Sequence, residues 1–185
     1  MATTTETQQK TTWKIDESHS AVEFAVKHMM ISSTKGRFAK FEGEITLDEA
    51  DLANSLVNVT IDTASIDTHD AKRDEHLRSA DFFDVANHPQ ITFASTRIVP
   101  RSADEFDVIG NLSIRGITKE VTLKTEREGV GVSPWGAEVA AYTAKTEIDR
   151  KEFGLNWNVA LETGGILVGD KVKLNLEVEA VKQTA

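Results

Sequence analysis

Hydrophobic and polar residues alternate with a period of two along most of this chain. The clearest example is the segment 171–180, in which every even-numbered residue is apolar and every odd-numbered residue is polar or charged. A β-strand turns successive side chains to opposite faces, whereas a helix would scatter the same residues around its axis. The segment is therefore predicted to be a strand with one face in the core and the other in water.

The same alternation recurs in other segments, which are separated by turn-forming residues such as Arg115-Gly116 and Gly164-Gly165. The pattern predicts about eight strands, at 11–16, 20–28, 35–47, 55–64, 90–99, 105–115, 117–128 and 138–148, with 171–181 as a further strand that closes the sheet. A sheet with this many strands tends to curl and close, which removes its unpaired edges. The pattern alone favours an antiparallel barrel or a sandwich and does not choose between them.

One segment, residues 68–80, interrupts the alternation. It is highly charged and lacks glycine and proline, and its Asp74 and Arg78 have the spacing of an ion pair on a helix. We expect a short surface helix near one end of the sheet, anchored by Phe82 and Phe83 and carrying local ion pairs. Such a segment is either a plain connector or a gate to the interior.

Composition narrows the partners. The 185 residues carry a net charge of −9, and an acidic domain repels phosphate backbones, so nucleic acid is not expected as a partner. The absence of cysteine excludes disulfides, thiolate metal sites and a cysteine nucleophile. The length suits one domain, and we predict a disordered polar tail at 1–10 followed by a single domain at 11–182.

The first residues lack the basic and apolar regions of a signal peptide, so a cytoplasmic protein is expected. No apolar run approaches the ~18 residues that a membrane-spanning helix needs, so no integral membrane association is expected. A homodimer is left open.

Candidate chemistry is sparse. The five histidines show no spacing typical of a metal site, and Asp16-Glu17-Ser18-His19 is better explained as a turn held by local hydrogen bonds than as a catalytic triad. There is no glycine-flanked nucleophilic serine and no phosphate-binding loop. We therefore expect no catalytic residue, no metal and no cofactor.

Seven groups of residues, taken in order, resemble the YceI-like family of lipid-binding proteins with a lipocalin-like fold. They are WKID (13–16) with HSAVEFAVKH (19–28), KGRF (35–38) with FEG (41–43), SIDT (65–68), RDEHLRSADFF (73–83), PQITFAST (89–96), GNLSIRGITK (110–119) and IDRKEFG (148–154). The resemblance implies an all-β, eight-stranded antiparallel barrel with a short helical excursion. It also implies an apolar tunnel for a polyisoprenoid, quinone-like or fatty-amide ligand. Many members of the family begin with a signal peptide, and this chain departs from them there.

We therefore expect the protein to bind an isoprenoid or other long-chain lipid inside the barrel, as a carrier or storage protein. Alternation assigns nine residues to the inward faces as candidate ligand contacts: Phe24, Val26, Phe38, Val59, Phe93, Leu112, Ile114, Leu174 and Leu176. One alternative is an enzyme that acts on an isoprenoid-like substrate in the same barrel, with His28 or Arg150 as the first candidates for its chemistry. Another is a stress protein with a solid core and no ligand.

Overall fold

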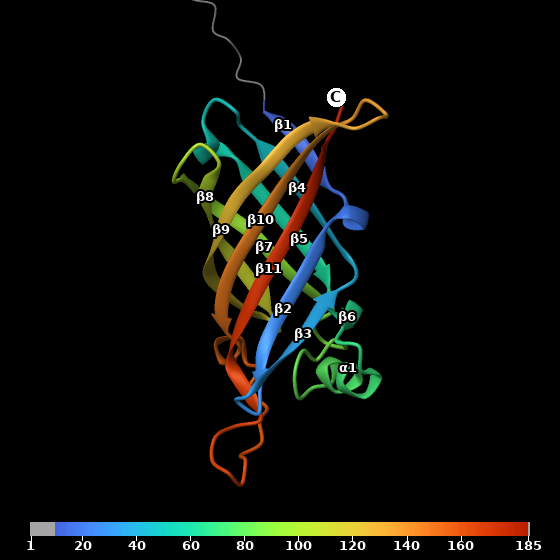
Figure 1. Ribbon diagram of the computed structural model, residues 1–185, viewed down its shortest axis with the longest axis vertical. Helices are drawn as coiled ribbons and strands as arrows, with labels where there is room; N and C mark the ends of the chain where they lie inside the picture. The colour runs from blue at the N-terminus through green and yellow to red at the C-terminus, as the bar shows by residue number, and fades with distance from the viewer. Residues whose placement is uncertain (1–9, 185) are drawn as a thin grey trace, which may run out of the picture.

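Eleven strands wind around a single axis in the computed structural model, which describes residues 10–184 (Figure 1). The eight strands of the barrel are β1 (Thr11–Ile15), β4 (Phe41–Leu47), β5 (Leu56–Asp62), β7 (Gln90–Pro100), β8 (Glu105–Ile114), β9 (Ile117–Val132), β10 (Glu138–Asp149) and β11 (Val168–Lys182). All neighbouring strands are antiparallel, which confirms the predicted all-β, eight-stranded barrel. Apart from Lys10, the predicted tail lies outside the described residues.

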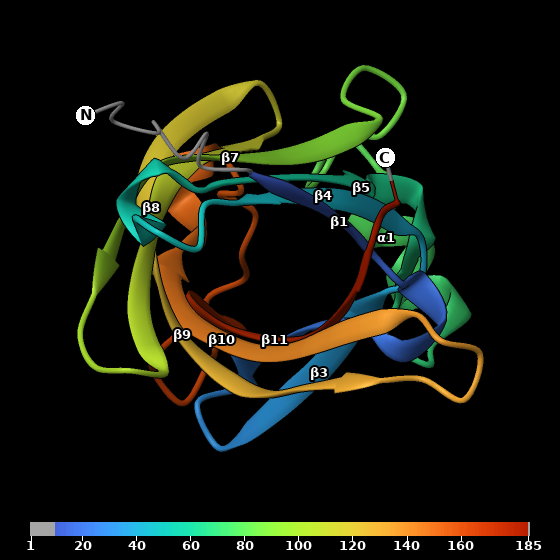
Figure 2. The ribbon, with the colours of Figure 1, turned by 90° about the horizontal axis from the view of Figure 1, so that it is seen from above.

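Closure depends on the short strand β1, which is bonded on both sides. In register, Trp13 lies opposite Ile45 of β4 and also opposite Lys182 of β11. The order β4-β5-β7-β8-β9-β10-β11 is a meander, and β1 joins its two edges into a ring (Figure 2). Neither edge is left with a free row of backbone groups at this level of the barrel.

Three further strands continue the sheet beyond β11 at the other end of the molecule. They are β2 (Ala21–His28), β3 (Ser32–Phe38) and β6 (Ile66–Asp67). The prediction of one strand over 35–47 is wrong, because the chain turns at Ala39–Lys40 between β3 and β4. Phe38 and Phe41, three positions apart, are both buried, and an uninterrupted strand would have turned them to opposite faces.

The predicted excursion contains one short helix, α1 (Ala71–Arg78). The expected pair between Asp74 and Arg78 is wrong. Asp74 is buried and accepts hydrogen bonds from the Thr68 amide at 2.9 Å and the Thr68 hydroxyl at 2.5 Å, while Arg78 donates to backbone carbonyls. Within residues 10–184, no helix is long and apolar enough to cross a membrane.

Candidate functional site: an apolar cavity along the barrel

A cavity of about 650 Å³ runs along the inside of the barrel, and its wall is almost entirely aliphatic and aromatic. Residues that are paired on neighbouring strands point to the same face and together form the wall. Val59 lies opposite Phe93, and Phe93 lies opposite Leu112. All nine residues assigned to inward faces from the sequence line the cavity. Their part in holding a ligand stays a prediction.

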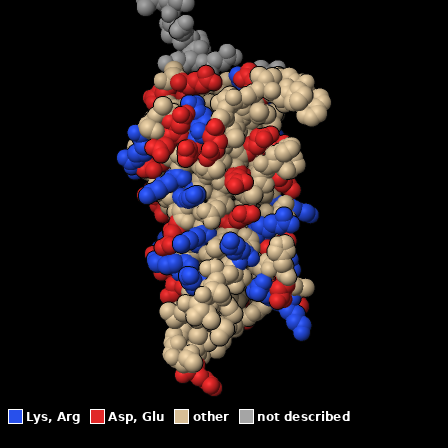
Figure 3. All heavy atoms as spheres, viewed as in Figure 1, with Lys and Arg blue, Asp and Glu red and all other residues tan. Residues whose placement is uncertain are grey.

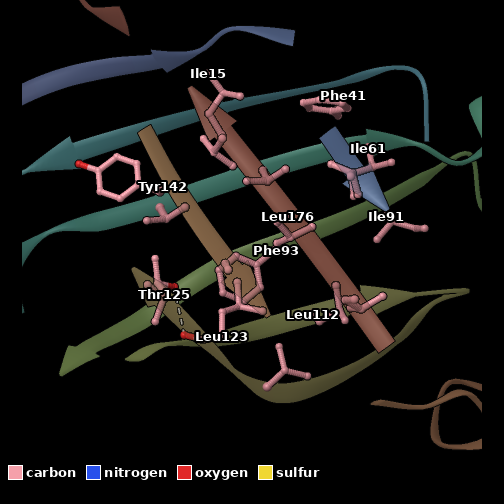
Figure 4. A pocket seen from close by; sticks show the side chains of 18 of the residues that line it. Ile15, Phe41, Ile61, Ile91, Phe93, Leu112, Leu123, Thr125, Tyr142 and Leu176 are labelled. Carbon is pink, nitrogen blue, oxygen red and sulfur yellow. Dashed lines mark hydrogen bonds between the residues drawn. The ribbon is translucent and has the colours of Figure 1, made fainter. Parts of the chain in front are cut away.

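Sequence reasoning missed a second group of wall residues on β1 and β10, two of which, Ile15 and Tyr142, are labelled in Figure 4. They are Trp13, Ile15, Ala140, Tyr142, Ala144 and Ile148. On β10 they occupy alternate positions, as a strand requires, but three small or polar residues at 140, 144 and 146 weaken the contrast between the two faces. The alternation on β10 is present in the sequence, but it is too weak to show which face of the strand points inward.

The two ends of the cavity differ. At the end near α1 the wall is completed by Phe82, Leu155 and Arg150, all of which are buried. At the opposite end the lining residues include Glu49, Arg127, Val130 and Glu138, all of which are exposed. We call these four residues and their surroundings the mouth, since they are exposed lining residues at the end of the barrel away from α1.

Arg150 lies at the inner end of the cavity, where its side chain holds the backbone together through hydrogen bonds. Its guanidinium donates to the backbone carbonyls of Leu155, Trp157, Val168 and Gly169 at 2.5 to 3.2 Å. Burial lowers the pKa of this guanidinium, and the nearby carboxylates of Asp170 and Asp149 oppose that effect. The N–H groups of the guanidinium therefore bind carbonyls of both the loop after β10 and the start of β11, and they hold these two segments together. Arg150 is thus committed to holding the end of the barrel.

The predicted polar turn at 16–19 lies on the outside of the barrel. The pKa of Asp16 falls to about 2 because His19 and Ser18 donate hydrogen bonds to its carboxylate. His19 Nδ1 lies 2.9 Å from Asp16 and 3.2 Å from the Ser18 hydroxyl, so one ring nitrogen contacts both partners. A triad needs the histidine to bridge its two partners through different nitrogens, so this geometry supports a local turn. Glu179 approaches His19 at 3.9 Å, and the group lies away from the cavity wall.

Tyr142 brings a hydroxyl into the wall near the mouth. Its ring packs edge-on against Phe106, with 6.1 Å between centroids, and burial raises the pKa of the phenol. Arg127 acts to lower that pKa and Glu49 to raise it, which places Tyr142 between the apolar tunnel and the charged mouth.

Alkaline titration tests this placement, because Tyr142 is the chain's single tyrosine and tyrosinate absorbance therefore reports on it alone. We expect ionisation in the folded protein above the ordinary value of about 10 and near that value after unfolding in denaturant. The fold favours the neutral phenol, so its contribution to stability is complete below pH ~10 and is lost as the pH rises through the folded-state pKa. A folded-state pKa at or below the unfolded one would contradict the burial of this ring.

Comparison with known proteins finds one domain family over nearly the whole chain. The model of the YceI-like domain matches residues 13–180. Protein YceI of Salmonella newport (strain SL254) is 42% identical over 173 residues, which cover 92% of this chain and 87% of the relative.

Solved structures agree with the fold. BcnA of Burkholderia cenocepacia superposes with a TM-score of 0.78 at 27% identity, over 89% of this chain and 98% of that one. The YCEI protein of Campylobacter jejuni gives 0.73 at 31% identity, over 85% and 90% of the two chains. A polyisoprenoid binding domain from Saccharophagus degradans gives 0.68 at 14% identity, over 92% and 98%, and at that identity it supports the fold alone.

Proposed function

Because the chain belongs to the YceI-like domain family, we propose that it binds one long apolar lipid, a polyisoprenoid or similar chain, inside the barrel as a carrier or storage protein. The observation that carries this proposal is the cavity, which is walled by apolar side chains from the mouth to the buried inner end. Its volume of about 650 Å³ falls among those of ordinary ligand sites, which span about 300 to 1,000 Å³. A domain of the same fold, from Saccharophagus degradans, is described as a polyisoprenoid binding domain.

Energetics favour an aliphatic ligand. Burial stabilises a hydrocarbon chain by ~0.8 kcal/mol per CH₂ group. Twenty buried carbons would contribute a gross ~16 kcal/mol, close to the limit of non-covalent affinity before the costs of ordering are subtracted. Apolar walls are therefore sufficient to hold the tail. A solid core, the alternative that needs no ligand, does not account for an apolar void of this size.

The proposal includes no covalent chemistry. Of the two residues first considered for catalysis, His28 is not among those that line the cavity, and Arg150 is committed to backbone carbonyls. Within residues 10–184, the titratable side chains at the wall are Arg150 at the inner end, Tyr142, and the charged residues of the mouth. Between Tyr142 and Arg150, the described part of the wall offers a bound chain no acid or base.

Uptake of phytane, a saturated C20 isoprenoid hydrocarbon, tests the proposal. The purified protein, stripped of lipid by solvent extraction and refolded, is titrated in competition with a fluorescent long-chain probe. Saturable displacement with one site per chain is expected. A folded protein that takes up neither the probe nor the hydrocarbon would overturn the proposal.

The excursion around α1 is expected to respond to loading. Leu77, Phe82 and Phe83 all reach the cavity, and Phe83 stacks edge-on against Phe38 at 5.9 Å. A lipid in contact with these side chains should slow amide exchange in residues 68–85 more than in 171–181, because short elements with few backbone partners open first. Exchange that is unchanged by lipid in 68–85 would leave the excursion as a passive connector.

A further inference from the structure

We propose that the Tyr142 hydroxyl donates a hydrogen bond to an uncharged oxygen on the ligand's head, so that the ligand is a long-chain isoprenoid alcohol, ester or ketone lying with its head at the mouth. The inference rests on the proposed function and narrows it. It makes Tyr142 a specificity-determining residue and excludes phosphate esters as the preferred ligands.

Most other polar groups in the wall already have partners. The Ser55 hydroxyl accepts from the Asp48 amide at 2.9 Å, and the Thr125 hydroxyl donates to the Leu123 carbonyl at 3.1 Å. Arg150 is engaged with carbonyls, as described above. Within residues 10–184 the Tyr142 hydroxyl donates to no acceptor, and no hydrogen bond contributes to the shift of its pKa. Because this hydroxyl is not among the fully buried polar atoms that lack a partner, it stays accessible, and a ligand oxygen beside it can accept its hydrogen bond.

The surroundings of Tyr142 leave space for a head group. Its neighbours on the same face of β10 are Ala140 and Ala144, whose side chains are the smallest of the inward row. In Figure 4 the hydroxyl points away from Leu176, Phe93 and Leu112, which lie deeper along the tunnel. A chain whose tail contacts those three residues would place its head beside the phenol.

Charge at the mouth disfavours an anionic head. Arg127 is paired with Asp104, with 2.8 Å between Nη2 and Oδ1, and Glu138 is paired with Lys182 at 3.0 Å. Together with Glu49, these two pairs contain three carboxylates and two cations, so their net charge is −1. Both cations, Arg127 and Lys182, are already paired. The face shown in Figure 3 is also rich in acidic side chains toward this end. A phosphate would meet repulsion here, whereas a neutral oxygen would meet a donor.

The test uses three ligands that share one C20 chain: phytane, its alcohol phytanol, and phytanyl phosphate. Each is titrated by the same competition assay against the unaltered protein and against Tyr142→Phe, which removes a single oxygen. The unaltered protein should bind phytanol about five- to tenfold more tightly than phytane, as one neutral hydrogen bond allows, and phytanyl phosphate more weakly than phytanol. In Tyr142→Phe the ratio of alcohol to hydrocarbon affinity should fall to nearly one.

Thr143→Val is the matched control, because it removes a hydroxyl from the neighbouring residue, whose side chain bonds Glu128 at 2.7 Å on the outer face. The alcohol preference should persist in this variant. A preference that survives in Tyr142→Phe, or phytanyl phosphate binding more tightly than phytanol, would overturn the assignment while leaving lipid binding intact. If none of the three ligands binds, the proposed function falls and this inference with it.

Discussion

Replacing Arg150 with methionine is expected to lower the free energy of unfolding by about 3 kcal/mol or more. Arg150 is 3% exposed, and its side chain donates to four backbone carbonyls, so that it links the loop after β10 to the start of β11. Methionine fills a similar volume but donates nothing, and each buried carbonyl left without a donor costs about 1 to 3 kcal/mol. Denaturant unfolding, followed by circular dichroism, measures the loss.

Arg101→Met is the control for this prediction. Arg101 also forms an ion pair, with Asp107, but its side chain is 60% exposed, and exposed pairs contribute about 0 to 1 kcal/mol. The control should therefore unfold close to the unaltered protein. A loss below about 1 kcal/mol in Arg150→Met would show that the carbonyls find other partners and that Arg150 does not hold this end of the barrel.

Replacing Ala144 with tryptophan is expected to abolish lipid uptake while the barrel remains folded. Ala144 is buried on the inner face of β10, opposite Leu176 on one side and Thr125 on the other. In a packed core such a change would force strain of about 1 to 3 kcal/mol, but here the indole has the cavity to enter. The ring would then occupy the space that the ligand needs.

Ala94→Trp places the same side chain on the outside of the barrel, since Ala94 is exposed on β7 between Asn58 and Asn111. It should bind phytane as the unaltered protein does. Unfolding curves for both variants separate blocked binding from lost structure. Unreduced uptake in a folded Ala144→Trp protein would place the ligand elsewhere than in this cavity.

The inner faces of most strands could be predicted because period-two alternation is a local property. Phe24 of β2 and Leu174 of β11 lie opposite each other in the sheet, and each was assigned to the inner face from its own strand alone. The mechanism is simple: once one face is buried, a slip of one residue would expose every apolar side chain on that strand. The same reasoning missed Tyr142 on β10, where the contrast between the two faces is weak. It also left out Trp13 and Ile15 of β1, although these two residues alternate clearly with polar ones.

Features that depend on distant residues could not be predicted from the residue pattern. Closure of the barrel requires Trp13 to lie opposite Lys182, at the other end of the chain, and alternation carries no information on such a pairing. The partners of Arg150 and Asp74 are mainly backbone groups, which sequence spacing does not reveal. The break at Ala39–Lys40 could have been found, because Phe38 and Phe41 fall out of phase.

Native mass spectrometry of the gently purified protein tests most directly whether the barrel holds a lipid. We expect the mass of a folded monomer plus one long-chain lipid, which is lost on solvent extraction and restored by incubation with phytanol. The Ala144→Trp protein, purified in the same way, should carry none. A folded protein that shows only its own mass, both as purified and after incubation with phytanol, would contradict lipid binding in the cavity.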